Sequence, residues 1–129
     1  MGGTVIWKPA ATAILSSYYT MQVLLEAGLP PGVINFVPGN AGTVSDALLT
    51  HRDLAGVHFT GSTAVGVRIA EAGARTMKRL LLELGGKGAA VVFDDADLTK
   101  VVAALASVWG FHSGQICTAP TRAIVHRSI

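Results

Sequence analysis

Cys117 carries the most reactive side chain of the sequence, within the stretch Gly-Gln-Ile-Cys-Thr-Ala. A cysteine thiolate is intrinsically very nucleophilic, so this residue could form a covalent bond to a substrate. A lone cysteine can equally be a small hydrophobic residue, and the local sequence leaves both interpretations open. It is the only cysteine among 129 residues, which excludes an internal disulfide and favours a reducing, cytoplasmic compartment.

Glu83 is a single carboxylate at the end of an apolar run, in Leu-Glu-Leu-Gly-Gly-Lys. A carboxylate in partly apolar surroundings suits general-base chemistry. The two glycines that follow would let a flat ring lie close against the backbone. The alternative is a glutamate that merely ends a strand before a glycine turn.

A possible phosphate site lies in Phe-Thr-Gly-Ser-Thr-Ala-Val-Gly, residues 59–66, where a strand runs directly into a helix. The free N–H groups and the dipole at such a helix start favour phosphate. A tight turn with Ser62 as the N-cap explains the same residues. Lys8, at the end of the first apolar run, could donate to ribose or phosphate, or could be a solvated surface lysine.

Metal binding is not expected from this sequence. The four histidines lack metal-ligand spacing, and the acidic residues Asp94, Asp95 and Asp97 are typical of a helix cap.

The overall composition excludes several functional classes. Half of the residues are hydrophobic, 14% are charged, the net charge is only +2, and the basic residues are scattered. Nucleic-acid binding is therefore not expected. No apolar run approaches the roughly 20 residues of a membrane span, and the N-terminus does not resemble a signal peptide. So apolar a chain is expected to belong to something larger or to associate with copies of itself.

The elements that would position these residues alternate between strand and helix. Strands are predicted over 4–7, 33–37, 55–59, 80–84, 89–93 and 122–126, and helices over 11–27, 43–50, 62–72 and 98–111. This alternation predicts an α/β, Rossmann-like fold with a mainly parallel sheet flanked by helices. Ligand sites of such sheets lie at the carboxyl ends of the strands, where Lys8, Gly61 and Glu83 fall.

Five motifs occur in the order and spacing of one known family: Val-Ile-Trp-Lys-Pro-Ala, Leu-Pro-Pro-Gly-Val-Ile-Asn-Phe-Val-Pro-Gly, Val-His-Phe-Thr-Gly-Ser-Thr, Leu-Glu-Leu-Gly-Gly-Lys and Gly-Gln-Ile-Cys-Thr-Ala. The chain resembles the middle of an NAD(P)-dependent aldehyde dehydrogenase. The 34 positions from Glu83 to Cys117 match the family's interval from base to nucleophile. The resemblance implies oxidation of a small aldehyde to a carboxylic acid by a homo-oligomeric enzyme.

The resemblance implies a role for each matching residue. Cys117 would be the nucleophile that forms a thioester, and its N–H would be half of the oxyanion hole. Glu83 would be the general base that activates water and helps to deprotonate the thiol. The implied dinucleotide-binding residues are Lys8, Phe59, Thr60, Gly61, Ser62, Val65, Leu84 and Gly85.

The resemblance favours NAD as the cofactor, with NADP also possible. Many NAD-using members carry a glutamate where this chain has Ala11, and losing that carboxylate makes a 2′-phosphate acceptable. The 1-pyrroline-5-carboxylate dehydrogenases, which oxidise glutamate semialdehyde, lack this glutamate too and use NAD.

The two halves of the chain resemble different subgroups. The first half is closest to 1-pyrroline-5-carboxylate dehydrogenase, whereas Leu84 and the residues after it follow general aldehyde dehydrogenases. The sequence therefore resembles a mosaic or a central fragment, with an apparent seam over 63–66.

The resemblance implies part of a dinucleotide-binding domain over 1–87 and the start of a catalytic domain over 88–129. The family's oxyanion asparagine and a glutamate that positions the nicotinamide ribose have no match here. A non-catalytic α/β module that at most binds nucleotide is the alternative function. A redox-sensing or acylated single-cysteine protein is a third possibility.

Overall fold

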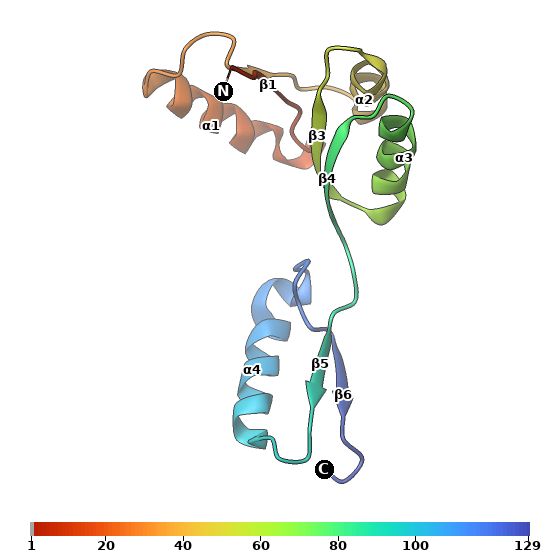
Figure 1. Cartoon of the computed structure of the whole chain (residues 1–129). Helices are drawn as coiled ribbons and strands as arrows, with labels where there is room; N and C mark the ends of the chain where they lie inside the picture. Colours follow the sequence, from red (N-terminus) through yellow and green to blue (C-terminus); the bar gives the residue numbers. More distant parts are fainter. Residues whose placement is uncertain (1) are drawn as a thin grey trace. The chain divides into compact units, whose positions relative to one another are not determined.

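The computed structural model describes residues 2–129, which form two compact units. One comprises residues up to 56 together with 72–79, and the other comprises 57–71 and 80–129. The elements, most of them labelled in Figure 1, are β1 (Val5–Trp7), a 3-10 turn (Ala11–Ala13), α1 (Ile14–Glu26), β2 (Ile34–Phe36), α2 (Ala41–Thr50), β3 (Gly56–Gly61), α3 (Thr63–Ala74), β4 (Arg79–Leu84), β5 (Ala89–Val92), α4 (Leu98–Gly110), a second 3-10 turn (Phe111–Gly114) and β6 (Arg122–Val125). The predicted α/β alternation is confirmed.

The strands pair two by two, and each pair is joined by a helical crossover. β1 pairs with β2 and β5 with β6, both in parallel, in the registers Val5–Ile34 and Ala89–Arg122. β3 pairs with β4 around α3. Within residues 2–129 the described strands make three two-stranded sheets.

Three helix boundaries follow from local side-chain and backbone chemistry. After α1, Gly28 has φ of 92° and Leu29 N–H donates back to Leu24 at 3.0 Å, so the predicted glycine stop is confirmed. Ser62 Oγ accepts from Val65 N–H at the start of α3. Asp97 accepts from the N–H groups of residues 99 and 100, which begins α4. Both predicted caps are therefore confirmed.

Gly56 is required by the close approach of β3 to β4. Arg79 N–H donates to Ala55 at 3.1 Å, which joins the beginnings of the two strands. A Cβ at Gly56 would lie 2.8 Å from the Arg79 carbonyl oxygen, a contact that backbone atoms cannot relieve by changing a rotamer.

Gly56→Ala is therefore expected to lower the free energy of unfolding by about 1–3 kcal/mol, as other overpacking changes do. Urea denaturation measures the change. Gly3→Ala is the matched control, because no atom lies within 4 Å of the added Cβ, and it should stay within about 0.5 kcal/mol of the parent. Equal effects of the two variants would contradict the close approach.

Met77 forms the turn between α3 and β4 in the left-handed region, with φ of 53°, and its side chain is 90% exposed. Lys78 N–H donates to Gly73 across this turn. A left-handed backbone costs a non-glycine residue roughly 1–2 kcal/mol, and this exposed side chain gains little packing in return.

Met77→Gly is expected to raise the free energy of unfolding by about 0.5–1 kcal/mol, the strain relief less the entropy glycine adds to the unfolded chain. A higher midpoint in urea would show it. Arg75→Gly, where the backbone is not left-handed, should be destabilising instead. A loss of stability in both variants would show that residue 77 is not strained.

Few side chains are buried within the described residues. The buried apolar residues are Met21, Ile69, Val92 and Ala119. Large apolar side chains lie exposed on both long apolar helices, for example Leu15 on α1 at 69% and Val102 on α4 at 66%. A helix that is apolar nearly all round, as α4 is, is normally covered on several sides by protein. These surfaces are candidates for contact with further protein.

Candidate functional site

A pocket of about 440 Å³ lies within the second unit, where the ends of β3 and β4 meet the loop that carries Cys117. It is lined by Thr60, Gly61, Glu83, Leu84, Gly85, Gly86, Lys87, Gly114, Gln115, Ile116, Cys117 and Thr121. The strand ends that the sequence singled out therefore contribute to one cavity.

Successive side chains of β4 point to opposite faces of the strand, so one set reaches the pocket and the other set packs on α3. Leu80, Leu82 and Leu84 are half-buried, whereas the residues between them are exposed. Leu84 packs against α3 so closely that a Cβ at Gly66 would lie 2.5 Å from its Cδ2. Because neighbouring residues of a strand point to opposite faces, Glu83 projects away from α3.

Gly61 and Gly66, which set the glycine spacing of the possible phosphate turn, both permit close packing. A Cβ at Gly61 would lie 2.5 Å from the ring of Phe59, and one at Gly66 would meet Leu84. Packing alone accounts for these two glycines, so the helix start and Ser62 remain the basis of the phosphate prediction.

The loop that carries Cys117 begins with a left-handed run after α4. His112, Ser113 and Gly114 have φ of 47°, 56° and 71°. Left-handed φ in two successive non-glycine residues is costly and concentrates at functional sites. Ala119 N–H then donates to Ile116 at 3.0 Å, a turn that spans Cys117. The thiol is free and exposed.

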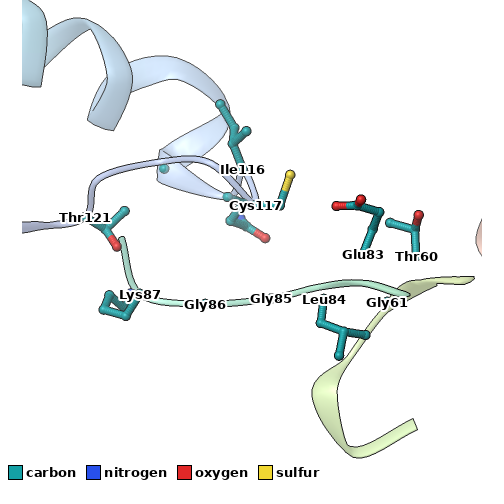
Figure 2. Close-up of a pocket in the computed structure, with 12 residues that line it drawn as sticks. Thr60, Gly61, Glu83, Leu84, Gly85, Gly86, Lys87, Ile116, Cys117 and Thr121 are labelled. Carbon is teal, nitrogen blue, oxygen red and sulfur yellow. The ribbon is translucent and has the colours of Figure 1, made fainter. Parts of the chain in front are cut away.

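Cys117 and Glu83 face a common space. Figure 2 shows the sulfur and the carboxylate pointing into the same part of the pocket, with the Thr60 side chain beside Glu83. A carbonyl carbon held there would have a nucleophile on one side and a base for water on the other. Glu83 itself is exposed, and the apolar residues Leu84 and Ile116 belong to the same pocket lining.

The backbone at Gly85 and Gly86 is open, because no atom lies within 4 Å of a Cβ built on either residue. Both residues line the pocket, so a flat ring could approach the chain closely at this point. This feature fits the nicotinamide dinucleotide that the resemblance implied.

Four of the predicted cofactor residues do not line the pocket. Phe59, Ser62 and Val65 lie in the same unit as the pocket but outside its lining, and Lys8 belongs to the other unit. Lys8 is half-buried, and its Nζ donates to the Pro9 carbonyl at 2.6 Å. Their proposed contacts with a dinucleotide stay predictions.

Several lining residues were not among the predicted site residues, although most of them lie inside the quoted motifs. They are Gly86, Lys87, Gly114, Gln115, Ile116 and Thr121. Gln115 and Ile116 are direct neighbours of the cysteine, so proximity in sequence was the signal that could have found them. Thr121 had no such signal, because only the turn after Cys117 brings it back.

Residues 2–129 contain no group of three His, Cys, Asp or Glu side chains that could hold a metal ion. The structure assigns Asp97 to the cap of α4 and to a salt bridge with Lys100 at 3.3 Å. In the same described stretch, every helix is too short or too polar to cross a membrane.

Comparison with known proteins places the chain in a family. Residues 1–129 match the aldehyde dehydrogenase family along their full length. The chain therefore belongs to the aldehyde dehydrogenase family.

The relatives include a general aldehyde dehydrogenase and a 1-pyrroline-5-carboxylate dehydrogenase, the two subgroups that the sequence resembles. The chain is 48% identical over 129 residues to NAD(P)+ aldehyde dehydrogenase 2 of Saccharomyces cerevisiae, covering 99% of this chain and 26% of the yeast protein. It is 45% identical over 135 residues to the 1-pyrroline-5-carboxylate dehydrogenase of Staphylococcus epidermidis, with the same coverage of both chains.

A solved structure of PnpE in complex with nicotinamide adenine dinucleotide superposes with a TM-score of 0.89 at 43% identity. The match covers 99% of this chain and 26% of the PnpE chain. The chain thus spans about a quarter of the length of the relatives it matches.

Proposed function

We propose that the chain contributes the cofactor cleft and the catalytic cysteine loop of an enzyme that oxidises a small aldehyde to a carboxylic acid with NAD or NADP. The observation that carries the proposal is the shared pocket of Cys117 and Glu83 beside the open backbone at Gly85. The assignment of residues 1–87 to the dinucleotide-binding part and 88–129 to the catalytic part belongs to the same proposal.

In this proposal Cys117 attacks the aldehyde carbon. The sulfur forms a bond to that carbon, and the carbonyl oxygen becomes an oxyanion that the Cys117 backbone N–H stabilises. NAD, when bound, would supply the acceptor for a hydride, and loss of that hydride from the substrate carbon leaves a thioester on Cys117. The thiol proton leaves before or during the attack. Glu83 is the carboxylate of the pocket lining that can receive it, and it passes this proton to solvent before hydrolysis begins.

Glu83 then acts on water. Its carboxylate takes a proton from a water molecule, the hydroxide oxygen bonds to the thioester carbon, and the carbon–sulfur bond breaks. The carboxylic acid leaves and the Cys117 thiolate is restored. The exposure of Glu83 supports this step, since water has direct access to the carboxylate.

The cofactor would lie along the strand ends. Gly85 and Gly86 would allow a ring to approach, Thr60 and Leu84 would border it, and the start of α3 at Ser62 would favour a phosphate group. Lys8 would donate to ribose hydroxyls, and Ala11 would leave room for NADP. Similarity to a 1-pyrroline-5-carboxylate dehydrogenase makes glutamate semialdehyde a candidate substrate.

The cofactor part of the proposal is tested by thermal unfolding during titration with NAD and then NADP. A ligand that binds only the native state stabilises it by RT ln(1 + [L]/Kd), about 2.7 kcal/mol at 100 times Kd. We expect Tm to rise by several degrees with at least one of the two cofactors. The better ligand would settle the effect of Ala11.

Paired glycine variants locate that binding. Gly85→Val places a branched side chain on the open backbone and should remove the Tm shift. Gly3→Val changes an equally open glycine outside the pocket and should keep it. A cooperative transition with no shift in the unmodified chain would refute dinucleotide binding by these residues.

A non-catalytic module is the second candidate function, and the large apolar side chains that lie exposed on α1 and α4 favour it. In that case the exposed apolar faces of α1 and α4 would drive association with other protein, including further copies of the chain. Aldehyde-dependent NADH formation distinguishes the two functions. It should be measured with the chain alone and with the chain in place of the matching quarter of the yeast relative.

A further inference from the structure

Trp109, near the end of α4, fastens the loop that carries Cys117. Its Nε1–H donates to the Pro120 carbonyl oxygen at 2.8 Å. Among residues 2–129 this is the only side-chain hydrogen bond that reaches the segment 114–121; the other described bonds of that segment join backbone groups.

The second half of the loop, residues 119–122, also contacts the residue that precedes β5. Arg122 N–H donates to the Gly88 carbonyl at 3.2 Å, which pairs this half with the start of β5. Gly88 also passes so close to the loop that a Cβ there would lie 3.0 Å from the Ala119 oxygen. Ala119 is 4% exposed, and Pro120, the acceptor for Trp109, comes directly after it.

The two ends of the loop come together beside Trp109. A Cβ at Gly114, where the loop begins, would lie 3.5 Å from Thr121 Cγ2 and 3.7 Å from the Trp109 carbonyl oxygen. The residue that begins the loop, the residue that ends it and Trp109 are therefore neighbours. The indole bond joins α4 to the closing side of a loop that has Cys117 near its middle.

Trp109 contributes little to a core. It is 42% exposed, and the ring pairs found within the described residues do not include it. A half-exposed tryptophan at a helix end whose indole N–H is fully engaged is placed for that bond more than for burial.

We propose that Trp109 is a positioning residue for Cys117. Its indole N–H, through the Pro120 carbonyl, fixes the loop and so the direction in which the sulfur enters the pocket. The catalytic meaning of this role rests on the proposed function, whereas the control of the loop does not.

The test compares two tryptophans of the same chain. Trp109→Phe removes the N–H donor and keeps an aromatic ring. Trp7→Phe is the matched control, because Trp7 lies on β1 and pairs with Phe36, outside the pocket lining. The readout is the second-order rate constant for alkylation of Cys117 by iodoacetamide. We expect Trp109→Phe to change this rate at least threefold, and Trp7→Phe to leave it unchanged.

A tryptophan isostere separates the hydrogen bond from ring packing. Benzothienylalanine at position 109 has the shape of tryptophan but no N–H group, so it should reproduce the Trp109→Phe rate. An isostere that retains the wild-type rate would overturn the proposal, because shape alone would then hold the loop. An unchanged rate in all variants would overturn it as well.

An indole NMR signal supplies a readout that a purely structural role would not move. The chain has two tryptophans, so Trp7→Phe assigns the indole N–H signal of Trp109. We expect that signal to exchange slowly with solvent and to shift when Cys117 is alkylated. Exchange as fast as that of free tryptophan, or no shift on alkylation, would overturn the proposal.

Failure of the proposed function would look different. If NAD and NADP produce no Tm shift in the unmodified chain, the cofactor proposal fails. The change in the alkylation rate of Cys117 in Trp109→Phe still decides whether Trp109 positions the loop. If Trp109→Phe keeps the cofactor-induced Tm shift and its Cys117 is alkylated at the parental rate, only the positioning role of Trp109 is refuted.

Discussion

Cys117→Ser is expected to abolish aldehyde oxidation while cofactor binding persists. The exchange of sulfur for oxygen keeps the size of the side chain but replaces a thiol by a hydroxyl that is far less acidic and a much weaker nucleophile. Removing the nucleophile from a set of residues that act together costs about 10³–10⁶ in kcat in well-studied enzymes. A loss of at least about 10³ is therefore expected.

The measurement is NADH formation with the chain in place of the matching quarter of the yeast relative, which supplies the length that this chain does not span. Thr118→Ser is the matched control, since it makes a similarly small change one residue away and should keep most of the activity. The NAD-induced Tm shift should be equal in both variants. A Cys117→Ser variant with more than a tenth of the parental rate would exclude Cys117 as the nucleophile.

The fold could be predicted from the sequence wherever one local rule determined the structure. Gly28 ends α1 because its left-handed backbone suits glycine, and Ser62 and Asp97 begin α3 and α4 because their oxygens cap free N–H groups. α2 begins at Ala41, two residues before the predicted start, because the Asn40 side chain accepts from Thr43 N–H and caps the helix.

The pairing of strands was predicted less well, because it depends on surfaces that distant parts of a protein supply. The alternation of strands and helices indicated a parallel arrangement, and the described pairs β1–β2 and β5–β6 are parallel. The sequence of a single strand does not determine how many other strands pair with it. Exposed apolar residues such as Val91 on β5 and Ile124 on β6 show that these faces are uncovered here.

The central residues of the candidate site were predictable and their surroundings were not. Cys117 and Glu83 follow from motif spacing, and the pocket contains both. The Trp109 bond could not be foreseen, because it depends on a loop whose path is set by three left-handed residues. The exposure of Glu83 also escaped prediction, since leucines flank it in sequence but face the other side of β4.

Glu83→Gln is expected to separate the two halves of the reaction. The amide keeps the shape of the side chain but cannot accept a proton from water, so hydrolysis of the thioester should slow by about 10²–10⁴. Transfer of hydride to NAD precedes that step. Rapid mixing should therefore show a burst of about one NADH per Cys117, followed by a much slower steady state, whereas Cys117→Ser should show no burst.

Added hydroxylamine tests this assignment, because it attacks a thioester without needing a general base for water. It should restore turnover in Glu83→Gln and release the hydroxamate of the substrate acid. Glu71→Gln is the control, since Glu71 is an exposed carboxylate on α3 that lies outside the pocket lining, and it should behave as the parent.

The size and rate of the burst decide what else Glu83 does. A full burst at the parental rate would confine Glu83 to the activation of water. A burst of the same size but slower would show that the carboxylate also removes the proton from Cys117, as the common space of the two side chains in Figure 2 allows. An unchanged steady state in Glu83→Gln would show that another group activates water, and Glu83 would then be only a residue near the end of β4.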